Sequence, residues 1–343
     1  MPAAALAQLQ AELRGRGLVH GDLRAPERIG DGHSNLTYRL TDGTASFVLR
    51  RPPPPPVPPG AHDVLREAAF LRGLVGSGVP VPAVLITAAA GELLDVPCFV
   101  MELIEGDVVT TDEPPTLADP AQRRAAGESL VDTLAALHAV DWQAAGMAGL
   151  GRPEGFNGRH LHRMARLVAD DEGRPPVAFR AVQDWLASHV PAESGATVVH
   201  NDYRLGNVVL STGTPARVAA VLDWELATLG DPLFDLGYLL ASVPVAGRPH
   251  TPTQELGTAM LGDGWPDRVA LARRYQEATG ADLTALPWFE TLAHWKLAVL
   301  YEYGRRRAVE GIGDLYYRDP QLVRSFLRAA HTSAGLPAPQ EDP

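Results

Sequence analysis

The sequence predicts an α+β protein of two lobes, in which a small lobe built on an antiparallel sheet precedes a larger, mainly helical lobe. Three observations favour this fold class. The chain has 343 residues, which is more than a single hydrophobic core usually serves. Short segments of alternating apolar and polar residues lie before residue 104, as in strands. Helical spacing of apolar residues dominates afterwards. We therefore predict lobes of residues 1–104 and 105–343.

The first predicted elements of the small lobe are a helix and a β-hairpin. Leucines at helical spacing predict a helix up to about Arg14. From Glu27 to Arg51, apolar and polar residues alternate around an Asp42-Gly43 turn, which is typical of a hairpin. The run at residues 51–60 is mostly proline and lacks the N–H groups of a helix or a central strand. We expect a stiff, extended connector there, rather than a docking peptide for a partner protein.

A second helix and two further strands are predicted to complete the small lobe. Apolar residues from Val64 to Val75 recur at helical spacing. Two strands, at Glu92–Leu94 and Cys98–Leu103, are expected around a turn at residues 95–97. In the larger lobe, three short strands are expected between helices, at residues 197–199, 208–210 and 218–222.

Composition excludes several classes of function. The 30 basic and 41 acidic residues give a net charge of −11, which argues against nucleic-acid partners and anionic membrane surfaces. No stretch approaches the roughly 18–20 apolar residues of a membrane span, and the first residues lack the basic start of a secretory signal. The single cysteine, Cys98, lies in an apolar run and is expected to be a buried thiol. We therefore expect a cytoplasmic protein. Lysine occurs once, at Lys296, so arginines supply the other cations.

One motif in the larger lobe carries the predicted chemistry. His200, Asp202 and Asn207 lie in a turn between two apolar segments, and Asp223 follows at the end of the next apolar segment. An aspartate and an asparagine five residues apart in such a turn can point into one cleft. The second carboxylate can then share a metal ion with the asparagine. Phosphoryl transfer needs these parts, namely a carboxylate that orients the acceptor hydroxyl and oxygen ligands for Mg²⁺.

The pattern His-x-Asp-x₄-Asn followed by an apolar-Asp pair resembles the catalytic and metal-binding segments of protein kinases. It is still more similar to the aminoglycoside phosphotransferase (APH) family, particularly the branch of kinase-like domains attached to some acyl-CoA dehydrogenases. The segments HNDYRLGNVVL, VLDWELATLGDPLFDLGYLL and LAALHAVDW carry this resemblance, which covers roughly residues 28–238. It implies a protein-kinase-like bilobal fold. It also implies a small-molecule kinase that transfers the γ-phosphate of ATP or GTP to a hydroxyl group with the help of Mg²⁺.

The resemblance assigns a role to each residue of the motif. Asp202 becomes the catalytic carboxylate, and Arg204 becomes a cation that stabilises the transferring phosphate. His200 is expected to brace the loop more than to act as a base. Asn207 and Asp223 become the ligands of Mg²⁺. Glu225 is a candidate for an additional metal ligand, and Asp235 is expected to be an internal buttress of the loop.

The small lobe contains the expected nucleotide-binding residues, with one departure from kinases. Gly32, Ser34 and Asn35 lie where a loop covers the phosphates, and their backbone and side chains can donate hydrogen bonds. Kinases place a lysine on the following strand, whereas the cation in register here is Arg50. Arginine pairs well with phosphate and with carboxylates. Glu67 on the next helix is the expected partner of this arginine, with a surface position as the alternative.

By the same resemblance, the chain between the lobes would read the nucleobase through the backbone of Glu102 and Ile104. The acceptor would bind in the helical lobe near Asp202. Candidate acceptors are an aminoglycoside-like antibiotic, a hydroxyacyl thioester or hydroxy acid, a nucleoside, and an amino alcohol. Four residues are candidates for the acceptor pocket, with simple packing as the alternative for each: Tyr203, Trp295, Tyr301 and Glu302.

A second hypothesis is a catalytically silent scaffold that binds a nucleotide or a metabolite. Its support is the arginine at position 50, which leaves the geometry of the nucleotide open. Against it, Asp202, Asn207 and Asp223 are all present. Under either hypothesis the partners are a nucleotide or other small molecule, and a homodimer is left open.

Overall fold

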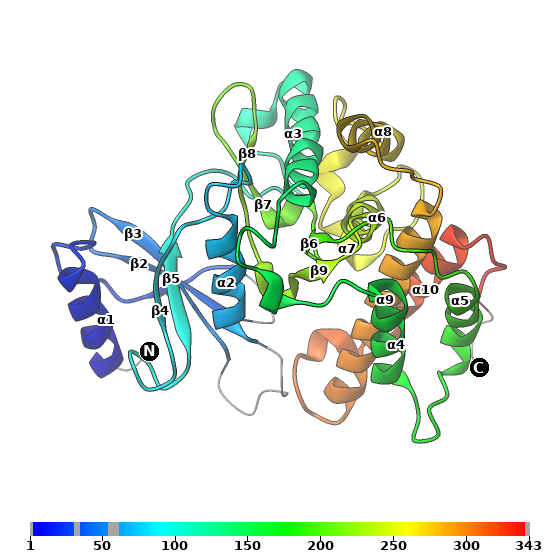
Figure 1. Ribbon diagram of the computed structural model, residues 1–343, viewed down its shortest axis with the longest axis horizontal. Helices are drawn as coiled ribbons and strands as arrows, with labels where there is room; N and C mark the ends of the chain where they lie inside the picture. Colours follow the sequence, from blue (N-terminus) through cyan, green and yellow to red (C-terminus); the bar gives the residue numbers. More distant parts are fainter. Residues whose placement is uncertain (1–2, 31–34, 54–61, 340–343) are drawn as a thin grey trace.

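A five-stranded antiparallel sheet forms the small lobe in the computed structural model, which describes residues 3–30, 35–53 and 62–339 (Figure 1). The strand order is β1-β2-β3-β5-β4. The strands are β1 (Glu27–Arg28), β2 (Leu36–Thr41), β3 (Ser46–Arg51), β4 (Val84–Ala88) and β5 (Cys98–Glu102). Strands β2 and β3 form the predicted hairpin, with Thr37 paired to Arg50. The rest of the proline-rich run, residues 54–61, lies outside the described residues.

The two faces of this sheet are covered by different helices, α1 (Ala3–Gly15) and α2 (Val64–Leu74). Side chains alternate between the faces of a strand, so neighbours on β3 enter different cores. Leu49 joins the core under α1, while Val48 joins the core that contains α2 and the larger lobe. Arg50, two residues after Val48, therefore points toward α2. Cys98 is fully buried on the α1 side, as expected.

The strand predicted at Glu92–Leu94 is wrong, because this segment forms a turn before β5. Gly91 has φ +86°, a left-handed conformation that favours glycine, and its N–H donates to the Leu94 carbonyl at 2.7 Å. The Glu92 carboxylate accepts a hydrogen bond from the Ala89 N–H at 2.7 Å. These local bonds close a turn. The strand that pairs with β5 is instead β4, a few residues earlier in the chain.

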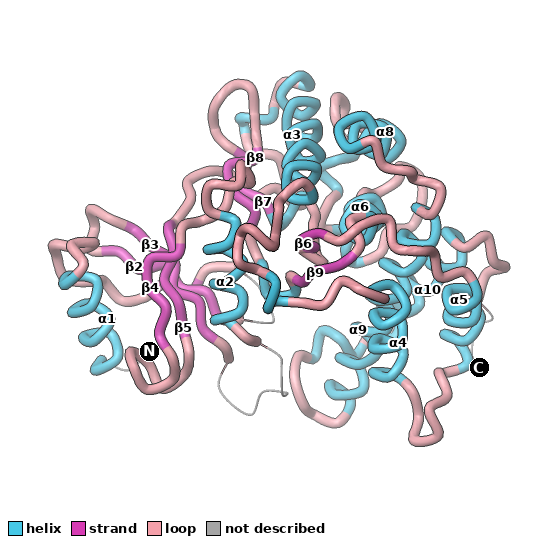
Figure 2. The backbone as a smooth tube through the Cα atoms, in the orientation of Figure 1, coloured by secondary structure: helices cyan, strands magenta, loops and turns pink. Residues whose placement is uncertain are grey.

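Helices make up most of the larger lobe (Figure 2). They are α3 (Pro120–His138), α4 (Phe156–Val168), α5 (Val177–Ser188), α6 (Leu233–Ser242), α7 (Pro252–Glu255), α8 (Arg268–Thr279), α9 (Leu286–Val309) and α10 (Pro320–Ser333). Two of them begin with an aspartate cap followed by proline, at Asp119 and Asp319. Helix α9 packs against α4, α5, α6 and α10 and forms the centre of the lobe. In the part of the chain that the structure describes, no helix has the length and apolar character needed to cross a membrane.

Four short strands between these helices frame the site. They are β6 (Thr197–Val199), β7 (Val208–Leu210), β8 (Val218–Val221) and β9 (Thr228–Gly230). Strands β6 and β9 form one antiparallel pair, and β7 and β8 form another. The three predicted strands are confirmed, while β9 was not predicted. The turn between β6 and β7 holds the motif residues, and β8 ends immediately before Leu222 and Asp223.

The two lobes meet at a close backbone contact around Gly106. This glycine has φ +150°, and a Cβ atom at its position would overlap the carbonyl of Leu210 on β7. The next residue, Asp107, exchanges two backbone hydrogen bonds with Leu210, at 2.9 and 2.8 Å. The connection is thereby tied to the strand that follows the motif. The lobe boundary after residue 104 stays a prediction.

Candidate active site

One buried carboxylate holds the turn after β6, residues 200–207, through hydrogen bonds to its backbone. Asp235 of α6 is fully buried and accepts the backbone N–H of His200 at 2.6 Å and of Asn201 at 2.7 Å. Charge-assisted bonds of this kind are strong. This is the buttress that the sequence predicts. Asn201 adopts φ +73°, which is uncommon for a residue other than glycine and turns the chain sharply before Asp202.

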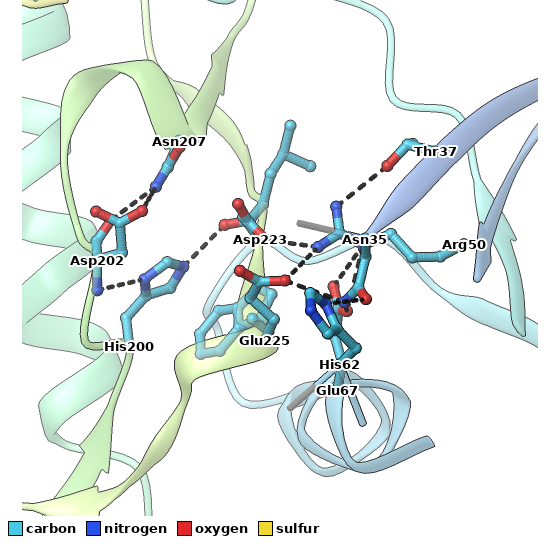
Figure 3. A network of polar contacts seen from close by, with 12 residues as sticks. Asn35, Thr37, Arg50, His62, Glu67, His200, Asp202, Asn207, Asp223 and Glu225 are labelled. Carbon is cyan, nitrogen blue, oxygen red and sulfur yellow. Dashed lines mark hydrogen bonds and ion pairs between the residues drawn. The ribbon is translucent and has the colours of Figure 1, made fainter. Parts of the chain in front are cut away.

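Asp202 and Asn207 lie together in this turn (Figure 3). The Asn207 amide nitrogen donates to Asp202 Oδ2 at 2.7 Å and to the Asp202 carbonyl at 2.8 Å. Asp202 Oδ1 is buried and accepts no hydrogen bond from the described residues. Its nearby cation is Arg204, whose Nε lies 3.6 Å away. One carboxylate oxygen is thus held by Asn207, while the other has no hydrogen-bond donor among the described residues.

His200 braces the turn rather than facing a substrate. The ring is fully buried, with Nε2 2.8 Å from the Leu222 carbonyl. Its Nδ1 accepts the Asp202 backbone N–H at 3.3 Å. Both nitrogens are therefore committed to backbone groups, with the proton on Nε2. This arrangement ties the turn to the segment that carries Asp223.

Asn207 and Asp223 are brought together by the β7–β8 pair. The Leu222 N–H donates to the Asn207 carbonyl at 2.8 Å, so the two predicted metal ligands flank one backbone bond. Asp223 has φ +65°, a second left-handed residue at the site. Amide and carboxylate oxygens are ligands that Mg²⁺ prefers, so these residues fit the ion. In the described ranges, no three His, Cys, Asp or Glu side chains are grouped so that they could hold a metal ion by themselves. Phosphate and water oxygens would complete such a site.

Arg50 connects the small lobe to this site. Its Nε lies 3.1 Å from Glu67 Oε1, which confirms the predicted ion pair, and Glu67 is buried rather than at the surface. Its Nη2 lies 2.5 Å from Asp223 Oδ1 and 3.7 Å from Glu225 Oε2. Its Nη1 donates to Thr37 Oγ1 at 3.2 Å. A single guanidinium thus faces three carboxylates.

The charges of this cluster shift the pKa values of its members. Burial alone would lower the pKa of Arg50, but Glu67, Asp223 and Glu225 together raise it above its ordinary value. Burial raises the pKa of Glu67 to about 7, and Asp223 and Glu225 add to this rise although Arg50 opposes it. Three carboxylates against one cation leave the cluster with excess negative charge, which favours a divalent cation.

The predicted phosphate loop is described only in part. Gly32 and Ser34 lie outside the described residues. Asn35 is buried, and its amide nitrogen donates to Glu225 Oε2 at 3.0 Å and lies 3.4 Å from Glu67 Oε2. The amide therefore faces carboxylates in this structure, and the role of Asn35 at a phosphate stays a prediction. Glu225, left open as a metal ligand, here serves as a contact between the lobes.

Two backbone positions in the segment between the lobes, Glu102 and Ile104, are predicted to read a nucleobase. The Glu102 N–H already donates to the Ala83 carbonyl at 3.0 Å, and the Glu102 side chain accepts the Ala83 N–H at 3.2 Å. Neither backbone group of Ile104 forms a hydrogen bond with the described residues. The role of Ile104 in base recognition stays a prediction, while Glu102 has only its carbonyl to contribute.

Most of the chain matches a known protein family. A family model described as the phosphotransferase enzyme family, APH, matches residues 25–289. The chain belongs to this phosphotransferase family. The matched region contains Arg50, the turn at residues 200–207 and Asp223. It ends in the first turn of α9.

Relatives of this APH-family chain include much longer proteins. Acyl-CoA dehydrogenase family member 10 of Mus musculus is 33% identical over 207 residues, covering 60% of this chain and 19% of that protein. Acyl-CoA dehydrogenase family member 11 of Rattus norvegicus is 32% identical over 234 residues, covering 68% of this chain and 30% of that protein. The chain thus spans less than a third of either relative.

Solved structures share the fold of the APH-family chain. A provisionally assigned aminoglycoside phosphotransferase of Ralstonia eutropha is 28% identical, with a TM-score of 0.79 over 96% of this chain and 98% of that one. The GDP and kanamycin complex of APH(2″)-IIIa is 16% identical, with a TM-score of 0.59 over 96% and 99%. A ternary complex of an APH(4)-Ia mutant with AMP-PNP and hygromycin B is 17% identical, with a TM-score of 0.58 over 95% and 98%. The predicted kinase-like bilobal fold is confirmed.

Three of the four residues proposed for the acceptor pocket of this APH-family protein are buried. Tyr203 is fully buried and donates its hydroxyl to the Leu130 carbonyl at 2.7 Å. Trp295 is also fully buried. Glu302 is buried and paired with two arginines of its own helix. Tyr301 alone is half-buried. Aromatic residues near the motif were therefore mostly packing, the stated alternative.

One pocket of the APH-family chain lies away from the predicted site residues. A pocket of about 560 Å³ lies between α5 and the start of α9, with Trp185 and Trp288 in its wall and none of the predicted site residues. Beside Arg204 and Leu205 the free volume is only about 10 Å³. Between the lobes, the ion pairs of Arg50 bring the two sides together in this structure.

One residue at the APH-family site was missed by the sequence analysis. Lys296 of α9 is 3% exposed, and its Nζ donates to the Asn201 carbonyl at 2.7 Å and to Asn201 Oδ1 at 2.5 Å. The signal was present in the sequence. The only lysine of the chain stands within an apolar run of α9, where a charge must have a partner.

Proposed function

We propose that the chain transfers the γ-phosphate of ATP or GTP to a hydroxyl group of a small molecule in a Mg²⁺-dependent reaction. The observation that carries this proposal is the state of the Asp202 carboxylate. One of its oxygens is held by Asn207, the other accepts no hydrogen bond from the described residues, and Asp223 is on the adjoining segment. Kinases use such a set to orient an acceptor hydroxyl next to a metal-bound phosphate.

In the proposed reaction the acceptor oxygen forms a bond to the γ-phosphorus while the bond from that phosphorus to the β–γ bridging oxygen breaks. ADP or GDP leaves with the electron pair of that bond. The proton of the acceptor hydroxyl passes to Asp202 Oδ1 and then to solvent. Proton transfer to a placed side chain typically contributes ~10²–10⁴-fold to the rate. Arg204 is the nearby cation for the charge on the transferring group.

Asn207 and Asp223 would hold Mg²⁺ through their side-chain oxygens. An ion held there would supply positive charge that offsets the charge of the nucleotide phosphates. Arg50 takes the place of the usual lysine and binds a phosphate when it releases Asp223. Glu67 then remains as its buried partner, 3.1 Å away. Arginine keeps its charge throughout, so the exchange needs no proton transfer.

The nature of the substrates is supported by complexes of structural neighbours. One neighbour was solved with GDP and kanamycin, another with AMP-PNP and hygromycin B. These complexes favour a nucleotide donor and a small-molecule acceptor. The candidate acceptors of this chain are aminoglycoside-like antibiotics, hydroxyacyl thioesters or hydroxy acids, nucleosides and amino alcohols. A cytoplasmic location and a homodimer stay predictions.

The test combines nucleotide binding with turnover. The Tm of the wild type should rise with ATP or GTP only in the presence of Mg²⁺, and Asp223→Ala should lose this rise. A ligand at 100 times its Kd stabilises by about 2.7 kcal/mol, which shifts the Tm by several degrees. Asp202→Asn should keep the shift while its turnover with a confirmed acceptor falls at least about 100-fold. Full turnover in Asp202→Asn would show that this carboxylate is not the catalytic one.

A silent scaffold remains the second candidate, because Arg50 lies 2.5 Å from a proposed metal ligand and links the lobes without a nucleotide. This alternative predicts nucleotide or metabolite binding with no turnover across a broad panel of acceptors. Hydrolysis or transfer that depends on Asp202 would exclude it.

A further inference from the structure

The buried cation Lys296 contacts the turn at residues 200–207, which we call the catalytic turn, and the proposed reaction does not use this cation. Lys296 comes from the middle of α9, and the aromatic rings of Phe234 and Tyr238 on α6 lie 5.1 and 4.9 Å from its Nζ. Burying a charge in a core is costly unless other groups bond to it, so the groups that bond to Lys296 indicate its role. Its two hydrogen bonds both go to one residue, Asn201, immediately before Asp202.

Asn201 needs such a contact because of its backbone. Its φ of +73° lies in the left-handed region, which costs on the order of 1–3 kcal/mol for a residue other than glycine. Three contacts hold this conformation. Asp235 accepts a hydrogen bond from the Asn201 backbone N–H. The Leu226 carbonyl accepts one from the Asn201 side-chain amide. Lys296 donates to both oxygens of Asn201, the backbone carbonyl and Oδ1. Of these contacts, only the one from Lys296 reaches the carbonyl that leads into Asp202.

We propose that Lys296 is a positioning residue of the catalytic turn, which fixes the Asp202 carboxylate by holding Asn201 in its left-handed conformation. The inference rests on the proposed function in so far as Asp202 is the catalytic carboxylate. The proposed role of Lys296 needs no contact with the nucleotide or the acceptor. It acts through the peptide between Asn201 and Asp202.

The surroundings of Lys296 decide its charge. The titratable groups that face it come from three elements: Asp202 of the turn, Asp235 and Tyr238 of α6, and His160 and Arg163 of α4. Burial lowers the pKa of Lys296 to about 8, and Arg163 adds to this, while Asp202 and Asp235 oppose it. Burial and the nearby Lys296 hold the pKa of His160 well below its ordinary value, so His160 stays neutral. Lys296 is therefore cationic at neutral pH and loses its charge in mildly alkaline solution.

Kinetics distinguish positioning from simple packing. Lys296→Met keeps the length of the side chain but removes both hydrogen bonds to Asn201. We expect kcat for nucleotide turnover to fall about tenfold or more, with KM for the nucleotide within about twofold of wild type. Lys296→Arg should restore most of kcat, because a guanidinium can donate to both Asn201 oxygens. The matched control is Thr291→Val, a fully buried position on the same helix whose hydroxyl bonds only to Pro287 of α9. It should keep the wild-type kcat.

Two further readouts come from the same set of variants. Above pH 8 the wild-type kcat should decline as Lys296 loses its proton, whereas Lys296→Arg should lack this decline. Asn201→Gly keeps the left-handed backbone accessible but removes the side chain. If Lys296 acts through Asn201, the double variant Lys296→Met/Asn201→Gly loses less activity than the product of the single losses.

A measurement without catalysis protects the test from a failure of the proposed function. Because the chain has one lysine, labelling with [¹⁵Nζ]lysine gives one side-chain signal in an NMR spectrum. Its pKa should be near 8, and the signal should move in Asn201→Gly but not in Thr291→Val. A signal with the pKa of an exposed lysine and no response to Asn201→Gly would overturn the contact.

The two possible failures have different signatures. If wild type and Asp202→Asn show no nucleotide turnover with any acceptor while the NMR signal behaves as expected, the proposed function fails and the contact between Lys296 and Asn201 stands. If wild type turns over and Lys296→Met keeps its kcat, or changes only in parallel with Thr291→Val, positioning by Lys296 is wrong. A Lys296→Met protein that does not fold leaves Lys296→Arg and its pH profile to decide.

Discussion

Arg50 of the small lobe lies 2.5 Å from Asp223 of the larger lobe, so one side chain joins both lobes through a proposed metal ligand. The same guanidinium holds the buried Glu67. Under the proposed function, a Mg²⁺–nucleotide complex that binds Asp223 must share it with Arg50 or separate the two residues. We therefore expect nucleotide binding to change the relative position of the lobes at this contact.

Loss of the cation at position 50 should destabilise the protein strongly. Arg50→Met leaves Glu67 buried without its cation, and breaking a buried pair in this way costs about 3–5 kcal/mol. Urea unfolding followed by circular dichroism measures the loss. Adding Glu67→Gln should recover part of it, because no buried charge then remains. Arg174→Met, which breaks an exposed pair with Asp170, is the control and should leave the unfolding midpoint unchanged. Equal stability of Arg50→Met and wild type would contradict the ion pair.

Asp235 should be essential to the shape of the catalytic turn. Its two oxygens accept the N–H groups of His200 and Asn201, so Asp235→Asn places an amide NH₂ against one of these donors. A buried donor without an acceptor costs about 1–3 kcal/mol. We expect that loss of unfolding free energy together with reduced nucleotide turnover. Asp282→Asn is the matched control, since the exposed Asp282 accepts from the Thr284 N–H and hydroxyl in a surface turn. A fully active and stable Asp235→Asn would show that the turn does not need its buttress.

The stability of the protein should rise in alkaline solution because of Lys296. The pKa of this amine falls from 10.5 to about 8 on folding. Between these two values the unfolded chain keeps a proton that the folded protein has lost, so the unfolding free energy increases with pH. Relative to Lys296→Met, the wild type should gain about 2 kcal/mol between pH 7.5 and pH 9.5. Parallel urea titrations of both proteins test this, and a constant difference would mean an ordinary pKa. Turnover should fall over the same range in which stability rises.

The close contact at Gly106 predicts a position that accepts no side chain. Gly106→Ala places a methyl group against the Leu210 carbonyl and strains a backbone with φ +150°. We expect a loss of about 1–3 kcal/mol, measured as a lower Tm. Gly149→Ala, which meets no atom within 4 Å and has no positive φ, is the control and should keep the wild-type Tm. An unchanged Tm in Gly106→Ala would mean that the connection between the lobes adapts freely.

The turn at residues 200–207 was predictable because its contacts are local. His200, Asp202 and Asn207 fall within eight residues, and short-range backbone bonds set their geometry. The pairing of Arg50 with Glu67 was predicted from the resemblance to kinases, and the structure confirms the ion pair. The contacts of the turn, in contrast, depend on residues that are close in sequence.

Contacts between distant segments were not predictable. Asn35 and Glu225 meet across 190 positions, and nothing near either residue indicates the other. The choice of β4 over residues 92–94 depended on a glycine turn that competes with a weak strand pattern. Tyr203 looked like a pocket residue because it adjoins Asp202, yet its ring points into the core. The direction of a side chain at a sharp turn depends on the left-handed residue before it, which sequence alone does not reveal.

The burial of the only lysine also gives the molecule an unusual chemical surface. An ester that reacts with primary amines finds no accessible lysine ammonium on the folded chain, since Lys296 is 3% exposed. Coupling to Lys296 therefore requires the helical core to open. Counting labels by mass spectrometry would then record how often the centre of the larger lobe comes apart under native conditions.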